Sequence, residues 1–184
     1  MSNQVDRRIL KSQKVIKSTF LTMLLEEGFD KMTVKAITER ADISRKTFYL
    51  HYVDKYDLLD AIVNQKLEEL GDICEQKKEK GFIEGTVIWF RYFEEHQAFF
   101  AALFASDSTV SFRKQLLHFI MHQLSLKLNP IDPGHEAEVL LKFLGMAVLG
   151  IVESFVLQQL KTGMEDIARQ VGELLERNIA MASP

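Results

Sequence analysis

Helical periodicity runs along nearly the whole chain of 184 residues and constrains its fold more than any other feature. Apolar residues recur every three or four positions, as on one face of an amphipathic helix, and no segment shows the alternation of a half-buried strand. Only three prolines occur, and two of them, Pro130 and Pro133, bracket one expected loop. The chain is therefore predicted to be all-α.

Composition and targeting signals narrow the class further. An apolar fraction of 47% is sufficient for a packed core. The single cysteine, Cys74, cannot form an internal disulfide, and the polar start lacks the apolar stretch of a signal peptide. The longest apolar run, 143–157, contains Glu153 and is shorter than the ~20 residues of a membrane span. We expect a cytoplasmic protein without a membrane segment.

The charge is divided unevenly along the chain. Residues 1–55 hold 11 Lys or Arg against 7 Asp or Glu, a net +4, whereas residues 56–184 hold 12 against 19, a net −7. The overall charge of −3 therefore conceals a basic N-terminal part. Such asymmetry is typical of a DNA-facing module joined to an acidic body.

Residues 33–59 predict two short helices joined by a tight turn and followed by a third helix. Val34, Ile37 and Ala41 have helical spacing, Asp42 lies in the turn, and Ser44 can cap the second helix. Asp is tolerated in the turn because it enters the left-handed region more readily than most residues. This arrangement is a helix-turn-helix, whose second helix reads bases in the major groove.

The segment resembles the DNA-binding domain of the TetR family of bacterial transcriptional regulators. Asp42 replaces the family's turn glycine and Lys46 replaces a frequent glycine, so base preference is where this chain departs most from the pattern. The counterparts of the family pattern are Thr33, Ile37, Thr38, Glu39, Ala41, Asp42, Ser44, Tyr49, Tyr52, Lys55, Asp57, Leu58 and Leu59.

DNA contacts are expected at the starts of the helices and around the recognition helix. Arg45, Lys46 and Thr47 are predicted to contact base edges. The phosphate backbone is expected to be held mainly by a second group, with Lys35 and Ser44 completing the DNA-binding set. That second group is Thr33, Tyr49, His51 and Lys55.

Two units are predicted, a helix-turn-helix domain over 1–60 and a helical effector-binding and dimerisation domain over 61–184. Asp54 can cap a helix that continues past Leu70 and joins the two as one rod. The helices expected beyond it span 82–95, 97–105, 110–128, 135–160 and 164–182.

The last two predicted helices carry the most regular apolar stripes. Both stripes could be core of one subunit, but the first of the two helices is apolar on more than one side. In the TetR family the two C-terminal helices form a four-helix dimer interface, and the resemblance implies that role here. The predicted interface residues are Phe143, Ala147, Ile151, Phe155, Ile167, Val171 and Leu174.

Eight of the 13 phenylalanines lie between Phe82 and Phe119. Aromatic residues at helical spacing most often form ordinary core, whereas an effector pocket needs apolar walls with a few polar groups. Many members of the TetR family hold an effector in this region, so a pocket is a second interpretation of the same residues. Its predicted members are Trp89, Phe93, Phe104, Phe119, His122 and Phe143.

Enzymatic and metal sites are not predicted. His118 and His122 share one helix face, but the intervening Phe-Ile-Met lacks the glutamate of a metalloprotease motif and no third ligand is evident. Glycine-rich phosphate-binding loops and the nucleophile-elbow motif are missing from the sequence. We therefore expect no enzyme, no cofactor and no metal.

The predicted function is that of a homodimeric regulator that binds double-stranded operator DNA, a repressor by family habit, released by a small-molecule effector. The alternative is a co-regulator of the same fold that acts by binding a partner regulator. The cluster of Arg45, Lys46, Thr47, Tyr49 and Lys55 favours direct DNA binding, because a protein that never met DNA would have no use for it.

Overall fold

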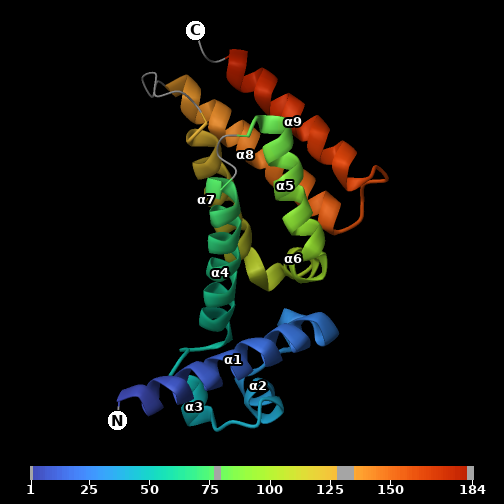
Figure 1. The fold of residues 1–184 in the computed structure, drawn as a ribbon. Coiled ribbons are helices and arrows are strands. Elements are labelled where there is room, and N and C mark those ends of the chain that lie inside the picture. The colour runs from blue at the N-terminus through green and yellow to red at the C-terminus, as the bar shows by residue number, and fades with distance from the viewer. Residues whose placement is uncertain (1, 77–79, 128–134, 182–184) are drawn as a thin grey trace.

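The computed structural model describes residues 2–76, 80–127 and 135–181, and across these ranges the regular secondary structure is helical (Figure 1). The elements are α1 (Ser2–Glu27), η1 (Phe29–Lys31), α2 (Val34–Arg40), α3 (Arg45–Tyr49), α4 (Lys55–Gln76), α5 (Phe82–Glu95), α6 (Gln97–Phe104), η2 (Asp107–Thr109), α7 (Val110–Ser125), α8 (His135–Val156) and α9 (Met164–Met181). The all-α prediction is confirmed.

The reader domain, α1 to α3, is held by local caps and a small aromatic core. Thr33 accepts a hydrogen bond from the backbone N–H of Ala36 at 3.1 Å, and Ser44 accepts one from Thr47 at 3.0 Å, so both short helices have capped N-termini. Asp42 adopts the left-handed region, with φ of 52°, as the turn requires. The predicted Ser44 cap and Asp42 turn are confirmed, and the Thr33 cap adds to them.

A reciprocal capping box starts the long helix α4. Asp54 Oδ1 accepts from the N–H groups of Tyr56 and Asp57 at 2.8 Å each, while Asp57 accepts from the N–H of Val53 at 2.8 Å. From this anchored start α4 rises out of the reader into the body as one helix (Figure 1). The predicted division after residue 60 falls inside α4.

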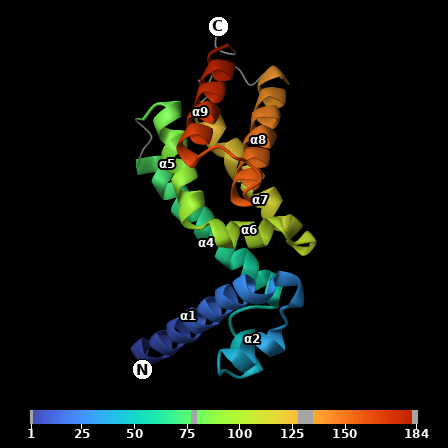
Figure 2. The same cartoon turned by 90° about the vertical axis from the view of Figure 1, so that its right-hand side faces the viewer.

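The body is built from two packed helix pairs. α9 lies along α5 and α8 lies along α7, with α6 crossing between the body and the reader (Figure 2). The contact between α5 and α9 is close because Gly172 has no side chain: a Cβ built there would lie 2.7 Å from Ile83 Cα. Ile167, Ala168 and Val171 are buried on this face of α9.

Most of the aromatic side chains in the body are core. Phe93 and Phe100 pack with ring centroids 4.6 Å apart, and Phe104 meets Phe112 at 5.0 Å. These four rings have at most 3% of their surface exposed. Aromatic density between Phe82 and Phe119 therefore reflects packing among α5, α6 and α7 more than the presence of a ligand site.

Three predicted helix ends are wrong, and the smallest difference is at the helix expected over 97–105, which ends at Phe104. The helix expected over 135–160 ends at Val156, because Gln158 takes a left-handed φ of 56° and the chain leaves the helical path. The helix expected over 110–128 ends at Ser125. Residue 128, and residue 182 at the end of the helix expected over 164–182, lie outside the described ranges.

One described segment, Glu138–Val156 within α8, has the length and apolar composition that a membrane-crossing helix needs. It also packs along α7, and Leu144, Val148 and Val152 on that side are buried. Core helices of soluble proteins satisfy the same length and composition test, so the segment is weak evidence for a membrane.

Candidate nucleic-acid interface and ligand cavity

The start of α3 presents a basic surface. Arg45 and Lys46 occupy its first turn and are exposed, directly after the Ser44 cap. Thr47 is half-buried, and its hydroxyl lies 2.9 Å from that of Ser44. The Ser44 cap holds the first turn of α3 in a fixed conformation. The two cationic side chains therefore extend into solvent from a rigid helix end.

Other predicted contact residues surround this turn. Thr33 caps α2 with its side chain exposed, and Lys35, two residues later, pairs loosely with Glu39 at 3.8 Å. Tyr49 is 57% exposed and rests edge-on against Phe48, with ring centroids 5.6 Å apart. An exposed ion pair contributes little, so Lys35 can exchange Glu39 for a phosphate at small cost.

Two predicted phosphate contacts are engaged inside the reader. The ring nitrogen Nε2 of His51 lies 2.7 Å from the hydroxyl of Ser12 on α1. Lys55 Nζ donates to the carbonyl of Phe29 at 3.0 Å and lies 4.4 Å from the centroid of that ring. The Lys55 ammonium ties η1 to α4, a contact between residues 26 positions apart that was not predicted, and its contact with a phosphate stays a prediction.

Lys55→Met, which keeps the aliphatic stem, is expected to lower the free energy of unfolding by about 1–3 kcal/mol, because the Phe29 carbonyl loses a charged donor. Denaturant unfolding measures this change. Lys35→Met is the matched control, since its ammonium is exposed, and it should leave stability within ~0.5 kcal/mol. Equal stability of the two variants would contradict a structural role for Lys55.

A polar contact that was not predicted joins the reader to the body. The Ser106 hydroxyl, between α6 and η2, lies 3.1 Å and 3.0 Å from the two carboxylate oxygens of Asp30 in η1. The hydroxyls of Ser108 and Ser106 hold the pKa of Asp30 below its ordinary value. The two residues are 76 positions apart in the chain. Serine and aspartate are common residues, and no pattern in the sequence predicts that these two would meet.

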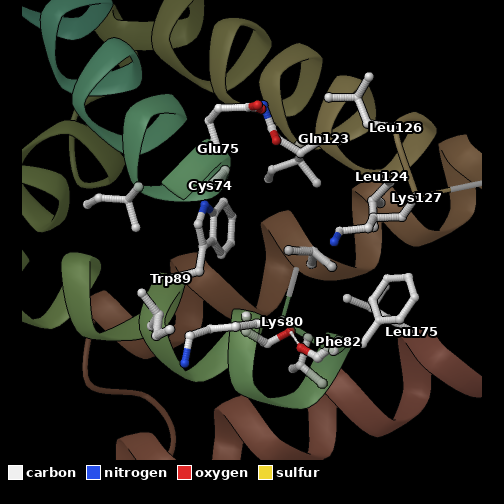
Figure 3. A pocket seen from close by; sticks show the side chains of 18 residues that line it. Cys74, Glu75, Lys80, Phe82, Trp89, Gln123, Leu124, Leu126, Lys127 and Leu175 are labelled. Carbon is white, nitrogen blue, oxygen red and sulfur yellow. Dashed lines mark hydrogen bonds between the residues drawn. The ribbon is translucent and has the colours of Figure 1, made fainter. Parts of the chain in front are cut away.

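A cavity of about 350 Å³ lies in the body between the end of α4, the start of α5, and α7, α8 and α9 (Figure 3). Its size falls in the range of small-molecule sites, and its walls are mainly apolar. The lining residues are Ile73, Cys74, Glu75, Lys80, Gly81, Phe82, Gly85, Thr86, Ile88, Trp89, Ile120, Gln123, Leu124, Leu126, Lys127, Val148, Val171 and Leu175.

The polar groups of the cavity are few. Burial raises the pKa of the Cys74 thiol to about 11, so the thiol is neutral at pH 7 and is a poor nucleophile or metal ligand. The Thr86 hydroxyl donates to the carbonyl of Phe82 at 2.7 Å. Lys80 is paired with Glu84. The cavity is therefore suited to binding, and its thiol is not set up for chemistry.

The cavity contains one member of the predicted effector set, Trp89. Phe93 and Phe104 are buried in the aromatic core, and Phe119 is half-buried outside the lining. His122 and Phe143 are exposed on α7 and α8. The cavity walls are mostly aliphatic, and the lining is assembled from five separated stretches of chain, so aromatic content alone does not locate the cavity.

An apolar face of α8 has no partner within the described chain. Phe143 is 62% exposed and Met146 is 50% exposed, with Val139 and Ala147 beside them on the same side of the helix. Leu174 of α9 is also exposed. Side chains of this size in one stripe are the usual sign of an interaction surface.

The predicted dimer residues divide into two groups. Phe143, Ala147 and Leu174 belong to the exposed side, but Ile167 and Val171 are buried against α5, at 6% and 7% exposure. Ile151 and Phe155 are half-buried, and Phe155 packs on Phe90 with ring centroids 5.6 Å apart. A two-fold contact therefore has α8 available, whereas the stripe on α9 is mostly used within the subunit.

His118 and His122 both lie exposed on α7. Within the described parts of the chain, no group of three or more His, Cys, Asp or Glu side chains is placed to hold a metal ion.

Two family models match the chain. The model for bacterial regulatory proteins of the tetR family matches residues 21–62, and a model for a transcriptional regulator C-terminal region matches residues 81–177. The first range holds the helix-turn-helix, and the second holds all of α5 to α8 and most of α9.

Similar proteins include YxbF of Bacillus subtilis (strain 168), an uncharacterized HTH-type transcriptional regulator, at 33% identity over 70 residues, which is 38% of this chain and 18% of YxbF. DhaS of Lactococcus lactis subsp. lactis (strain IL1403), a dhaKLM operon transcriptional activator, is 27% identical over 112 residues, 61% of this chain and 56% of DhaS. The matches thus span about a fifth and about half of these relatives.

Solved structures share the fold over nearly the whole chain. A TetR transcriptional regulator from Streptococcus agalactiae 2603V superposes with a TM-score of 0.72 at 24% identity, covering 95% of this chain and 99% of that one. The structure of the dihydroxyacetone kinase operon activator DhaS gives 0.68 at 21% identity, covering 92% and 97%.

Proposed function

Because the chain belongs to the TetR family of bacterial regulatory proteins, we propose that it is a cytoplasmic, homodimeric, sequence-specific DNA-binding transcriptional regulator controlled by a small molecule. The observation that carries the proposal is the capped first turn of α3, which presents Arg45 and Lys46 to solvent on a family-type helix-turn-helix. Control of transcription does not require chemistry, and no enzymatic role is proposed.

Two recognition helices must enter successive major grooves, with half-site centres about 34–36 Å apart or a multiple of that distance. Arg45, Lys46 and Thr47 are proposed to meet base edges. Thr33, Lys35, Ser44 and Tyr49 are proposed to hold phosphates. His51 can join them through Nδ1, since its Nε2 lies 2.7 Å from the Ser12 hydroxyl.

The effector site is proposed to be the cavity between α4 and the body. Ile73, Cys74 and Glu75 near the end of α4 line it, while the start of the same helix is fixed in the reader by Asp54 and Lys55. A molecule that binds better to one position of α4 shifts the population toward that position and changes the spacing of the two readers. Such an effector would release a repressor from its operator.

Arg45→Ala is expected to lower the free energy by which the protein discriminates between bases at particular positions, by about 1–3 kcal/mol for each position. The reason is that a bidentate contact to a base edge is lost. In vitro selection from a randomised DNA library, followed by gel shifts at stated salt, measures this. Arg169→Ala, exposed on α9 far from the reader, is the control. An unchanged preference after Arg45→Ala would remove that residue from base readout.

Activation is the second candidate, because the relative DhaS is named a transcriptional activator. An activator could bind DNA itself or act through a partner regulator. A reporter placed behind the selected operator distinguishes repression from activation. Failure of the purified protein to shift any selected DNA would favour the partner-dependent form.

A further inference from the structure

The hydrogen-bonding groups that line the cavity indicate which class of ligand it can bind. Trp89 lies half-buried on α5, with its ring held edge-on against Phe93 at a centroid distance of 4.8 Å. In Figure 3 its indole points toward the end of α4, where Cys74 lies. No described residue accepts a hydrogen bond from the indole N–H, whose nitrogen lies on the ring edge beside Cys74, so this lining residue has a donor without a protein partner.

The deeper walls offer no charge to a ligand. Ile120, Val148 and Val171 come from the middle of α7, α8 and α9, and all three are buried and apolar. The charged lining residues Glu75 and Lys127 come from helix ends and already have interactions of their own, and Lys80 is paired with Glu84. Moving a carboxylate or an ammonium against these three apolar side chains, away from the charged lining residues Glu75, Lys80 and Lys127, would cost several kcal/mol.

We infer that the cavity accepts a neutral, mainly apolar molecule carrying a hydrogen-bond acceptor, such as a carbonyl or ether oxygen, that meets the Trp89 indole N–H. The inference rests on the proposed effector role of this cavity and deepens it. Fatty carboxylates are excluded from this class of ligand because they carry a charge. Small polyols are excluded because their hydroxyls would lie unpaired against aliphatic walls.

Three probes of matched shape test the inference: 2-acetylnaphthalene, which is neutral with an acceptor, 2-ethylnaphthalene, which lacks the acceptor, and 2-naphthoate, which is anionic. Calorimetric titration of the full chain is expected to show the ketone binding about tenfold more tightly than the hydrocarbon, as one net hydrogen bond predicts. The anion should bind more weakly than both. An equal or tighter affinity for the naphthoate would overturn the inference.

Two variants assign the effect to the cavity. Trp89→Phe keeps a ring but removes the N–H. In this variant the affinity for the ketone should fall to the affinity for the hydrocarbon. Gly85→Leu should abolish binding of all three probes, because Gly85 lines the cavity and a Cβ built there meets no atom within 4 Å. Cys74→Ala should leave the ketone preference intact. Unchanged ketone preference in Trp89→Phe, or unchanged binding in Gly85→Leu, would contradict the inference.

Gel shifts with the selected operator separate this inference from the proposed function. If the ketone shows the expected preference but leaves DNA affinity unchanged, the ligand class stands and the effector role fails. If the naphthoate alone binds in the cavity and releases DNA, the effector role stands and the ligand class fails.

Discussion

Phe143→Glu combined with Met146→Glu is expected to give a folded monomer whose affinity for a two-half-site operator falls by on the order of a hundredfold or more. Both side chains are at least half exposed on α8, so the subunit tolerates the change, whereas a two-fold interface would place four carboxylates together. Losing the dimer removes the advantage of binding both half-sites at once. Light scattering and gel shifts measure the two effects.

The control is Asp72→Lys, an exposed change on α4 outside the apolar face, which should preserve both the dimer and DNA binding. Circular dichroism should show native helix content in the double glutamate variant. Ile167→Glu would be a poor test, because that side chain is buried against α5 and a charge there would destabilise the subunit itself. An intact dimer after both changes on α8 would place the interface elsewhere.

Gly172→Ala is expected to lower the free energy of unfolding by about 1–3 kcal/mol, and Gly172→Val by more, because α9 cannot stay so close to α5 once a side chain is present. The added Cβ would lie 2.7 Å from Ile83 Cα and 3.2 Å from Phe82 O, which are backbone atoms and cannot rotate away. For a chain of this size each kcal/mol lowers the melting temperature by ~2–4 °C.

Gly71→Ala is the matched control for that prediction. Gly71 also lies inside a helix, but its added Cβ would make only an ordinary contact of 3.7 Å with Phe119. Alanine has the higher helix propensity, so this change should raise stability by roughly 0.5–1 kcal/mol. Stabilisation by alanine at both positions would mean that α5 and α9 separate more easily than their packing implies.

Local features of the chain were predictable because their partners lie within one helical turn. The caps at Thr33, Ser44 and Asp54 bond to backbone groups two or three residues away, and the turn at Asp42 depends on that residue's own φ. The periodicity of α5 and α9 was equally local, and their predicted starts were confirmed.

What only the tertiary structure decided was which partner each apolar or polar face meets. The stripe on α9 predicted burial equally well against a second subunit or against α5, and the packing at Gly172 assigns most of it to α5. Likewise, the Lys55 ammonium lies 3.0 Å from the Phe29 carbonyl, a long-range contact that only the folded chain reveals. An amphipathic pattern determines which side of a helix is buried. Long-range packing determines which other helix covers that side.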